Sequence, residues 1–316
     1  MNLYPVKLSP TFKDYLWGGT RLKTVFNKDC SFERVAESWE LSAHKDGQST
    51  VITGPLKGLS FSEYVSKIGH EALGTNCRKY DYFPLLIKLI DAQGNLSVQV
   101  HPSDDYALAK EGEYGKTEMW YILDCEEGAT LYYGFTRDVT KDEYDAAIRD
   151  GKLTDIMNQV SVKRGDVFFI PAGTVHAIGA GILICENQQN SNTTYRVYDY
   201  NRRDKDGNLR PLHIEKALEV SCLKKSPELL PTAEGCDVLL TSCSYFDVRR
   251  LRISGAKTIT VDETSFVSLI VTDGHGTISL ESEEIDFTKG DSIFIPAQNA
   301  DFQIQGCCEM ILSKVN

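Results

Sequence analysis

Short apolar runs, broken by Gly, Pro and Asp, recur along most of the chain. Residues 83–91 form a mostly apolar run, which predicts a well-buried strand. Residues 96–101 alternate with period 2, so Ser97, Gln99 and His101 share one face of a predicted strand, opposite an apolar face. Further strands are predicted where aromatic and β-branched residues gather, at 119–123, 130–133, 166–171 and 181–186.

Three segments favour helices instead. Ser60 stands three residues ahead of Glu63, a capping box that predicts a helix running to about Ile68. Thr140 and Glu143 repeat that spacing ahead of residues 141–158, which contain helix formers without strand alternation. A third helix is predicted from 213 to about 222.

From Cys236 onward the chain consists of short apolar segments 8–12 residues apart. Many short strands at that spacing are typical of a β-sandwich or barrel. The fold class is therefore predicted as mainly β, with the helices inserted into it.

One segment of the chain occurs twice. Residues 164–176 and 289–301 share the frame basic-Gly-Asp-x-x-x-Ile-Pro-Ala, at an offset of 125 residues between Gly165 and Gly290. Two copies of one β-unit are favoured over chance similarity, because the Gly-Asp pair gives a tight turn into a strand in both. The first copy ends in His176 and the second in Asp301, so one copy is predicted to carry chemistry and the other to be structural.

Length and charge narrow the class of protein. A chain of 316 residues is long enough for about two domains. The net charge of −11 disfavours binding to nucleic acids over a broad surface. The sequence has no apolar run long enough for a membrane-spanning helix and no secretory signal pattern, so we expect a cytoplasmic protein without membrane or nucleic-acid partners.

Four residues have side chains of the metal-ligand type: Gln99, His101, Glu118 and His176. Two neutral imidazoles with one carboxylate, an amide oxygen and an open position suit Zn²⁺ acting as a Lewis acid, although ligand type alone also allows Fe²⁺ or Mn²⁺. Each residue taken singly is more often structural. His44 is as readily structural as functional, and Arg202, Arg203 and Lys205 are interpreted as a solvated loop rather than a phosphate site.

The spacing of Gly165, Pro171, Gly173 and His176 resembles the second signature of the cupin superfamily, which consists of small jelly-roll barrels. The first cupin signature is altered here, because Gln99 replaces its leading histidine and Glu118 follows seventeen residues after His101. That departure argues against dioxygenase-like chemistry.

Seven ordered stretches resemble the type I mannose-6-phosphate isomerases in their short bacterial form. They are Trp17–Gly19, Glu37–His44, Phe83–Lys88, Ser97–Pro102, Gly115–Glu118, Pro171–His176 and Thr194–Asp199. The resemblance implies two cupin barrels: a catalytic domain over residues 1–235 and a C-terminal, metal-free domain over 236–316.

The resemblance also implies the reaction and its residues. It implies one Zn²⁺ per chain held by Gln99, His101, Glu118 and His176, with Gln99 the weakest ligand. The implied activity is interconversion of mannose 6-phosphate and fructose 6-phosphate through an enediol(ate). Alternatives are another metal-dependent cupin sugar enzyme or a non-catalytic sugar-phosphate-binding cupin.

Three further residues are expected to contact the sugar phosphate. Arg196 matches the arginine that the resemblance marks as catalytic, and its permanent charge suits enediolate stabilisation and substrate positioning. Lys116 is predicted to bind phosphate or to act as an acid or base. Ser97 shares a strand face with Gln99 and His101 and is predicted to bind the substrate. The chain is compatible with a monomer or a homo-oligomer.

Overall fold

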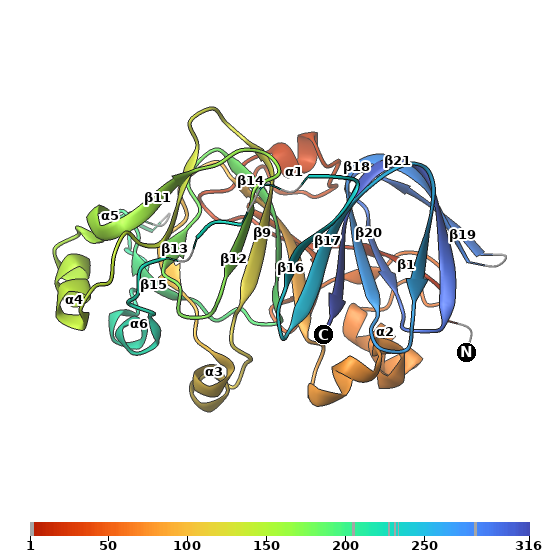
Figure 1. The fold of residues 1–316 in the computed structure, drawn as a ribbon, viewed down its shortest axis with the longest axis horizontal. Coiled ribbons are helices and arrows are strands. Elements are labelled where there is room, and N and C mark those ends of the chain that lie inside the picture. Colours follow the sequence, from red (N-terminus) through yellow and green to blue (C-terminus); the bar gives the residue numbers. More distant parts are fainter. Residues whose placement is uncertain (1–2, 204–205, 227, 231, 233, 281–282) are drawn as a thin grey trace.

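The computed structural model describes residues 3–203, 206–226, 228–230, 232, 234–280 and 283–316. β-Strands are the main regular elements of the described residues, and Figure 1 shows them in two neighbouring β units. The first unit is made of a six-stranded and a five-stranded sheet, and the second unit is an eight-stranded sheet. The prediction of a mainly β fold is confirmed.

The six-stranded sheet has the order β12 (Val167–Ile170), β9 (Glu118–Cys125), β14 (Ile182–Gln189), β7 (Leu85–Ala92), β3 (Glu37–Leu41) and β2 (Thr11–Lys13). The five-stranded sheet has the order β11 (Met157–Ser161), β10 (Thr130–Phe135), β13 (His176–Ala177), β8 (Val98–Val100) and β15 (Tyr195–Tyr198). A separate hairpin joins β4 (Ala43–His44) to β5 (Gly47–Gln48).

The second unit has the order β16 (Asp237–Ser242), β17 (Phe246–Val261), β21 (Ala300–Val315), β18 (Val267–Leu280), β20 (Ser292–Ile295), β1 (Val6–Ser9) and β6 (Thr50–Val51), with β19 (Glu283–Thr288) paired to β18. Two strands from the start of the chain therefore complete the sheet of the second unit. The domain division after residue 235 stays a prediction, and these two strands connect the segments on either side of it.

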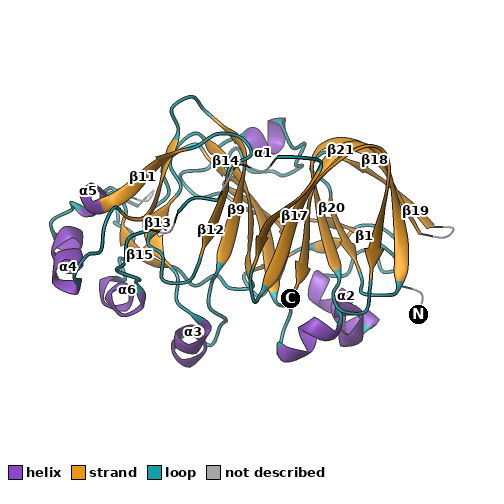
Figure 2. Ribbon diagram, viewed as in Figure 1, coloured by secondary structure: helices purple, strands orange, loops and turns teal. Residues whose placement is uncertain are grey.

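Helices lie at the periphery of both units (Figure 2). They are α1 (Arg21–Thr24), α2 (Phe61–Ile68), α3 (Asp104–Lys110), α4 (Lys141–Arg149), α5 (Leu153–Ile156) and α6 (Ile214–Val220), with the 3₁₀ turns η1 (His70–Leu73) and η2 (Thr75–Lys79). The predicted capping box at Ser60 and Glu63 is present, and α2 ends at Ile68 as expected. No helix among the described residues has the length and apolar character needed to cross a membrane.

The predicted helix over 141–158 is only partly right. It is divided into α4 and α5, and β11 begins at Met157. Its capping box is half formed, because Thr140 Oγ1 accepts the Glu143 backbone N–H while the Glu143 carboxylate pairs with Arg137. The arginine lies close enough to compete for the carboxylate, which the spacing of residues could not reveal.

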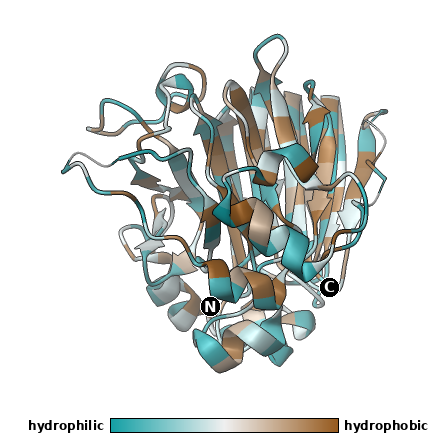
Figure 3. Cartoon of the chain, turned by 90° about the vertical axis from the view of Figure 1, so that its left-hand side faces the viewer, coloured by the Kyte–Doolittle hydropathy of each residue, from teal (hydrophilic) through white to brown (hydrophobic). Residues whose placement is uncertain are grey.

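The central strands of the six-stranded sheet are buried on both faces. In β9, Trp120 and Ile122 pack inside the first unit, whereas Met119 and Tyr121 pack against the second unit. This two-sided burial explains the nearly continuous apolar runs of the sequence. Where one face is less buried, apolar and polar positions alternate, as the brown and teal bands on several strands in Figure 3 show.

The five-stranded sheet positions the functional face of β8. Val98 and Val100 point outward, against helices α4, α5 and α6. Strand alternation therefore turns Ser97, Gln99 and His101 toward the interior of the first unit.

Candidate metal and sugar-phosphate site

Three residues far apart in the sequence meet inside the first unit. The ligand atoms of His101, Glu118 and His176 all lie within 4.8 Å of one another, and all three side chains are buried. His176 Nε2 is 3.2 Å from Glu118 Oε1, and His101 Nε2 is 3.6 Å from Glu118 Oε2. It is the only such group of His, Cys, Asp or Glu side chains among the residues that the structure describes.

The backbone fixes the direction of both imidazole rings. His101 Nδ1 lies 2.9 Å from the carbonyl oxygen of Thr193, and His176 Nδ1 lies 2.9 Å from that of Thr174. A carbonyl can only accept, so each Nδ1 carries the proton and each Nε2 presents a lone pair to Glu118. This is the arrangement in which histidine binds a metal ion.

Burial shifts the pKa values of the three groups. It lowers the pKa of His176 to about 4 and that of His101 well below its usual range, which keeps both rings neutral. It raises the pKa of Glu118 to about 8. Glu118 Oε1 has no hydrogen-bond partner among the described side chains and backbone groups, and Oε2 forms an ion pair with Lys116. A buried carboxylate facing two imidazole lone pairs is a site that a divalent cation would complete.

Gln99 and Lys116 border this group of ligands. Gln99 Nε2 lies 3.4 Å from His176 Nε2. Lys116 Nζ lies 2.9 Å from Glu118 Oε2 and 3.1 Å from His101 Nε2. Both residues also line a cavity of about 260 Å³, so the three buried groups lie directly behind the cavity wall.

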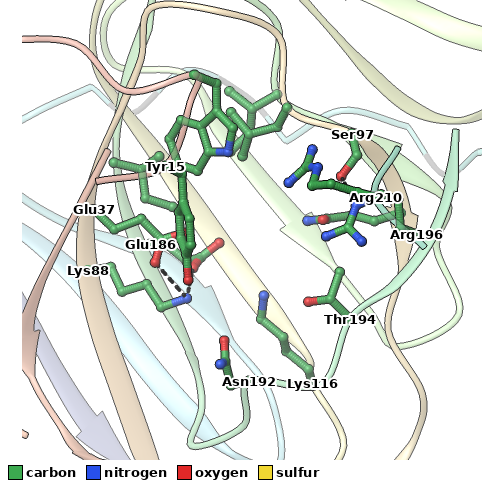
Figure 4. A pocket seen from close by; sticks show the side chains of 15 residues that line it. Tyr15, Glu37, Lys88, Ser97, Lys116, Glu186, Asn192, Thr194, Arg196 and Arg210 are labelled. Atoms are coloured by element: carbon green, nitrogen blue, oxygen red, sulfur yellow. Dashed lines mark hydrogen bonds and ion pairs between the residues drawn. The ribbon is translucent and has the colours of Figure 1, made fainter. Parts of the chain in front are cut away.

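The cavity separates an ionic wall from a basic wall, as Figure 4 shows. On the ionic wall, Lys88 Nζ lies 3.2 Å from Glu186 and 3.7 Å from Glu37. Burial alone would lower the pKa of Lys88, but Glu37 and Glu186 raise it overall. Burial alone would raise the pKa of Glu186, but Lys116 and Lys88 lower it to about 2.

The basic wall contains Arg196 and Arg210. Arg196 Nε donates to Ser97 Oγ at 3.2 Å, and its backbone pairs with that of Gln99 across β15 and β8. Burial and the charge of Arg210 lower the pKa of Arg196. Arg210 Nε donates to Asp199 Oδ2 at 2.7 Å, and Asp199 also binds Arg202.

All seven predicted site residues therefore converge on one region. Ser97, Gln99, Lys116 and Arg196 line the cavity, and His101, Glu118 and His176 lie behind its wall. Sequence reasoning missed the contributions of Tyr15, Glu37, Asn192, Thr194 and Arg210 to the lining. Glu37 stood in a matched stretch and could have been found there, whereas Arg210 lies in a loop with no distinguishing pattern. Lys205, of the predicted solvated cluster, lies outside the described residues.

Comparison with known proteins covers nearly the whole chain. Residues 6–150 match the family model of the phosphomannose isomerase type I catalytic domain, and residues 238–315 match the mannose-6-phosphate isomerase cupin domain. The chain is 40% identical to mannose-6-phosphate isomerase ManA of Bacillus subtilis, over 99% of both chains. The chain belongs to the type I phosphomannose isomerase family.

Two further similar proteins support the assignment. The mannose-6-phosphate isomerase of Streptococcus mutans is 38% identical over 99% of this chain and 98% of its own length. The crystal structure of the mannose 6-phosphate isomerase from Bacillus subtilis superposes with a TM-score of 0.86 at 36% identity, covering 98% of this chain and 99% of that one. The predicted family and cupin fold class are confirmed.

Proposed function

We propose that this chain interconverts D-mannose 6-phosphate and D-fructose 6-phosphate, using one Zn²⁺ per chain. Membership of the type I phosphomannose isomerases makes the chain an aldose–ketose isomerase. The observation that carries the proposal is the buried group of His101, Glu118 and His176 behind a cavity with two arginines on its far wall. An aldose–ketose isomerisation can use such a pairing, in which an electrophile polarises the carbonyl and fixed positive charge stabilises the enediolate.

The donor set fits zinc. Two imidazoles and one carboxylate, with the Gln99 amide beside them, form a site with an open position toward the cavity. Gln99 would have to turn its amide oxygen inward to bind the ion. When bound, the ion supplies a Lewis acid that polarises the substrate carbonyl.

The basic wall is suited to the phosphate group and to developing negative charge. Arg196 and Arg210 present guanidinium groups to the same cavity, and Ser97 Oγ lies beside Arg196. We assign phosphate binding to these residues because guanidinium groups can bind phosphate oxygens in pairs. We also assign stabilisation of the enediolate to Arg196, because its backbone pairs with that of Gln99, next to the predicted ligands.

The reaction removes a proton from C2 of the aldose and returns a proton to C1, with the enediolate between the two steps. The group that moves the proton must reach both carbons. Lys116 is our candidate, because its Nζ lines the cavity and contacts Glu118 and His101. As a neutral amine it would take the proton from C2, and as the resulting ammonium it would return a proton to C1. Lys88, Glu37 and Glu186 form a fixed ionic wall that holds the sugar hydroxyl groups.

A coupled isomerase assay tests the proposal. Zinc-loaded protein is expected to convert mannose 6-phosphate to fructose 6-phosphate, and protein treated with a chelator is expected to lose that activity and regain it with Zn²⁺. Absence of turnover in zinc-loaded protein would contradict the substrate assignment. Sustained turnover by fully metal-free protein would contradict the role of the metal.

A further inference from the structure

A second polar cluster lies next to the site, around His44. This residue follows the six-stranded sheet at the β4–β5 hairpin, and its side chain is 4% exposed. Its Nδ1 accepts the backbone N–H of Asp46 at 3.1 Å, so the proton of the neutral ring is on Nε2. His44 Nε2 points to Glu113 Oε1 at 3.6 Å.

Glu113 connects this hairpin to the segment between β14 and β15. Its Oε1 pairs with Lys45 Nζ at 2.5 Å. Its Oε2 accepts the backbone N–H of Asn192 and the hydroxyl group of Thr193, both at 3.2 Å. Burial alone would raise the pKa of Glu113, but Lys45, the Asn192 N–H and His44 lower it overall, so the carboxylate is charged.

A parallel contact reinforces this connection. Asn192 Nδ2 donates to Asp46 Oδ2 at 2.8 Å. The hairpin and Glu113 therefore hold residues 192–193 through two separate carboxylates. Hydrogen bonds to charged groups contribute more than neutral ones, so this arrangement restrains a segment that has no strand pairing of its own.

The restrained segment contributes to the proposed site in two ways. The carbonyl oxygen of Thr193 accepts from His101 Nδ1 and thereby sets the direction of a predicted zinc ligand. The side chains of Asn192 and Thr194 line the cavity (Figure 4). A shift of this segment would therefore move the His101 ring and the cavity wall together.

We propose that His44, Asp46 and Glu113 are positioning residues of the isomerase site. We call these three residues the 44–113 clasp. The clasp holds segment 192–194 so that Thr193 orients His101 and Asn192 faces the substrate. The clasp touches neither the predicted metal nor the cavity, and its role rests on the proposed function of the site.

Zinc affinity and kinetics of Glu113→Gln test the clasp. Gln keeps the size of the side chain and an acceptor oxygen but loses the charge that holds Lys45 and His44. Loss of a partner that orients a metal ligand typically costs 10–100-fold in affinity, and we expect the lower end, about 10-fold weaker zinc binding in competition with a chromophoric chelator. At saturating zinc, KM for mannose 6-phosphate should still rise. Glu143→Gln, at the exposed ion pair with Arg137, is the matched control and should change neither quantity.

Thr193→Val and Thr193→Ser separate positioning from folding. Valine keeps the shape but removes the hydroxyl group bound to Glu113, and serine restores that group. We expect Thr193→Val to weaken zinc binding in the direction of Glu113→Gln, and Thr193→Ser to recover most of the affinity.

The outcomes separate the clasp from the proposed function. Wild-type protein that neither binds zinc nor isomerises mannose 6-phosphate would overturn both. If the wild type binds zinc and is active, but Glu113→Gln has the same zinc affinity and KM as the wild type, the clasp alone is overturned. If Glu113→Gln fails to fold, equal zinc affinity of Thr193→Val and Thr193→Ser would overturn it.

Discussion

Gly165 in the first unit and Gly290 in the second adopt nearly the same left-handed backbone conformation, with φ of 94° and 95°. The aspartate that follows each glycine accepts a backbone N–H three residues earlier in the chain, at 2.9 Å for Asp166 and 2.7 Å for Asp291. Each glycine N–H also bonds to a neighbouring strand, at Ile122 or at Val271. The repeated sequence therefore builds the same turn twice.

The two units differ in the side chains that this shared frame positions. Ile170 pairs with Glu118 in the first unit, and the equivalent Ile295 pairs with Val267 in the second. His176 pairs with Gln99 in the first unit. The equivalent positions in the second unit are Asp301 and Thr260, which hydrogen-bond to each other at an exposed position.

The two units also differ in the side chains that they bury. The core cluster of the second unit is made of aliphatic and aromatic side chains with one cysteine, among them Leu269, Phe287 and Ile304. Arg250 and Glu309 of the second unit are also buried, but neither lines the cavity. The first unit buries the charged groups of Lys88, Glu118 and Glu186 at or behind that cavity. Burying charge costs free energy unless it is paired or binds an ion. The shared turn thus builds the same backbone in both units. The side chains at a few positions next to it decide whether a unit can bind a metal ion and a substrate.

The largest expected effect comes from exchanging equivalent residues of the repeat. His176→Asn removes one predicted ligand, and we expect kcat/KM to fall by at least about 10³-fold, since metal assistance contributes several kcal/mol. Asp301→Asn at the matched position should stay within about twofold. Steady-state kinetics of both variants check this, and similar losses in the two would remove the distinction between the units.

The second unit should respond in stability instead. Phe287 is 1% exposed in its apolar core, so Phe287→Ala should lower the free energy of unfolding by about 3–5 kcal/mol. Urea denaturation measures this loss. Zinc affinity of the folded variant should equal that of the wild type, and a large drop in zinc affinity would show that the second unit takes part in the site.

Arg196→Ala should separate substrate chemistry from metal binding within the first unit. Its guanidinium contacts Ser97 and none of His101, Glu118 or His176, so zinc content should be unchanged. We expect kcat/KM to fall by about 10²-fold or more, the cost of losing a preorganised donor. Full turnover would refute the catalytic assignment. Arg249→Ala, at the ion pair with Asp237 in the second unit, is the matched control.

The smallest effect concerns acid stability. The ordinary pKa of a glutamate is near 4.5, and that of Glu186 is lowered to about 2, so the unfolded chain binds a proton more readily than the folded one between these values. The stabilisation is present above pH 4.5 and is lost as pH falls toward 2. Urea denaturation from pH 6 to 3 should show the stability difference between wild type and Glu186→Gln shrinking, whereas a constant difference would contradict the assignment.

Period-2 patterning and the repeat were sufficient to predict the β fold, because strand burial and the Gly-Asp turn are local properties of the sequence. The pairing of β1 and β6 with the second unit could not be predicted, since strands of four and two residues carry almost no pattern. Gln99 and His101 share a predicted strand face, His176 ends a copy of the repeat, and Glu118 stands in a stretch that resembles a known family. Arg210 and the Thr193 carbonyl could not be found in this way, because their contribution depends on where loops lie in three dimensions.

Stepwise addition of Zn²⁺ to metal-free protein, with turnover of mannose 6-phosphate measured at each step, tests most directly whether the first unit alone is the catalytic centre. Activity should rise in proportion to bound zinc and reach its plateau at one ion per chain in wild type, with the same course in Asp301→Asn and no rise in His176→Asn. A plateau at any other stoichiometry, or full activity before zinc is added, would contradict the assignment of one zinc ion to His101, Glu118 and His176.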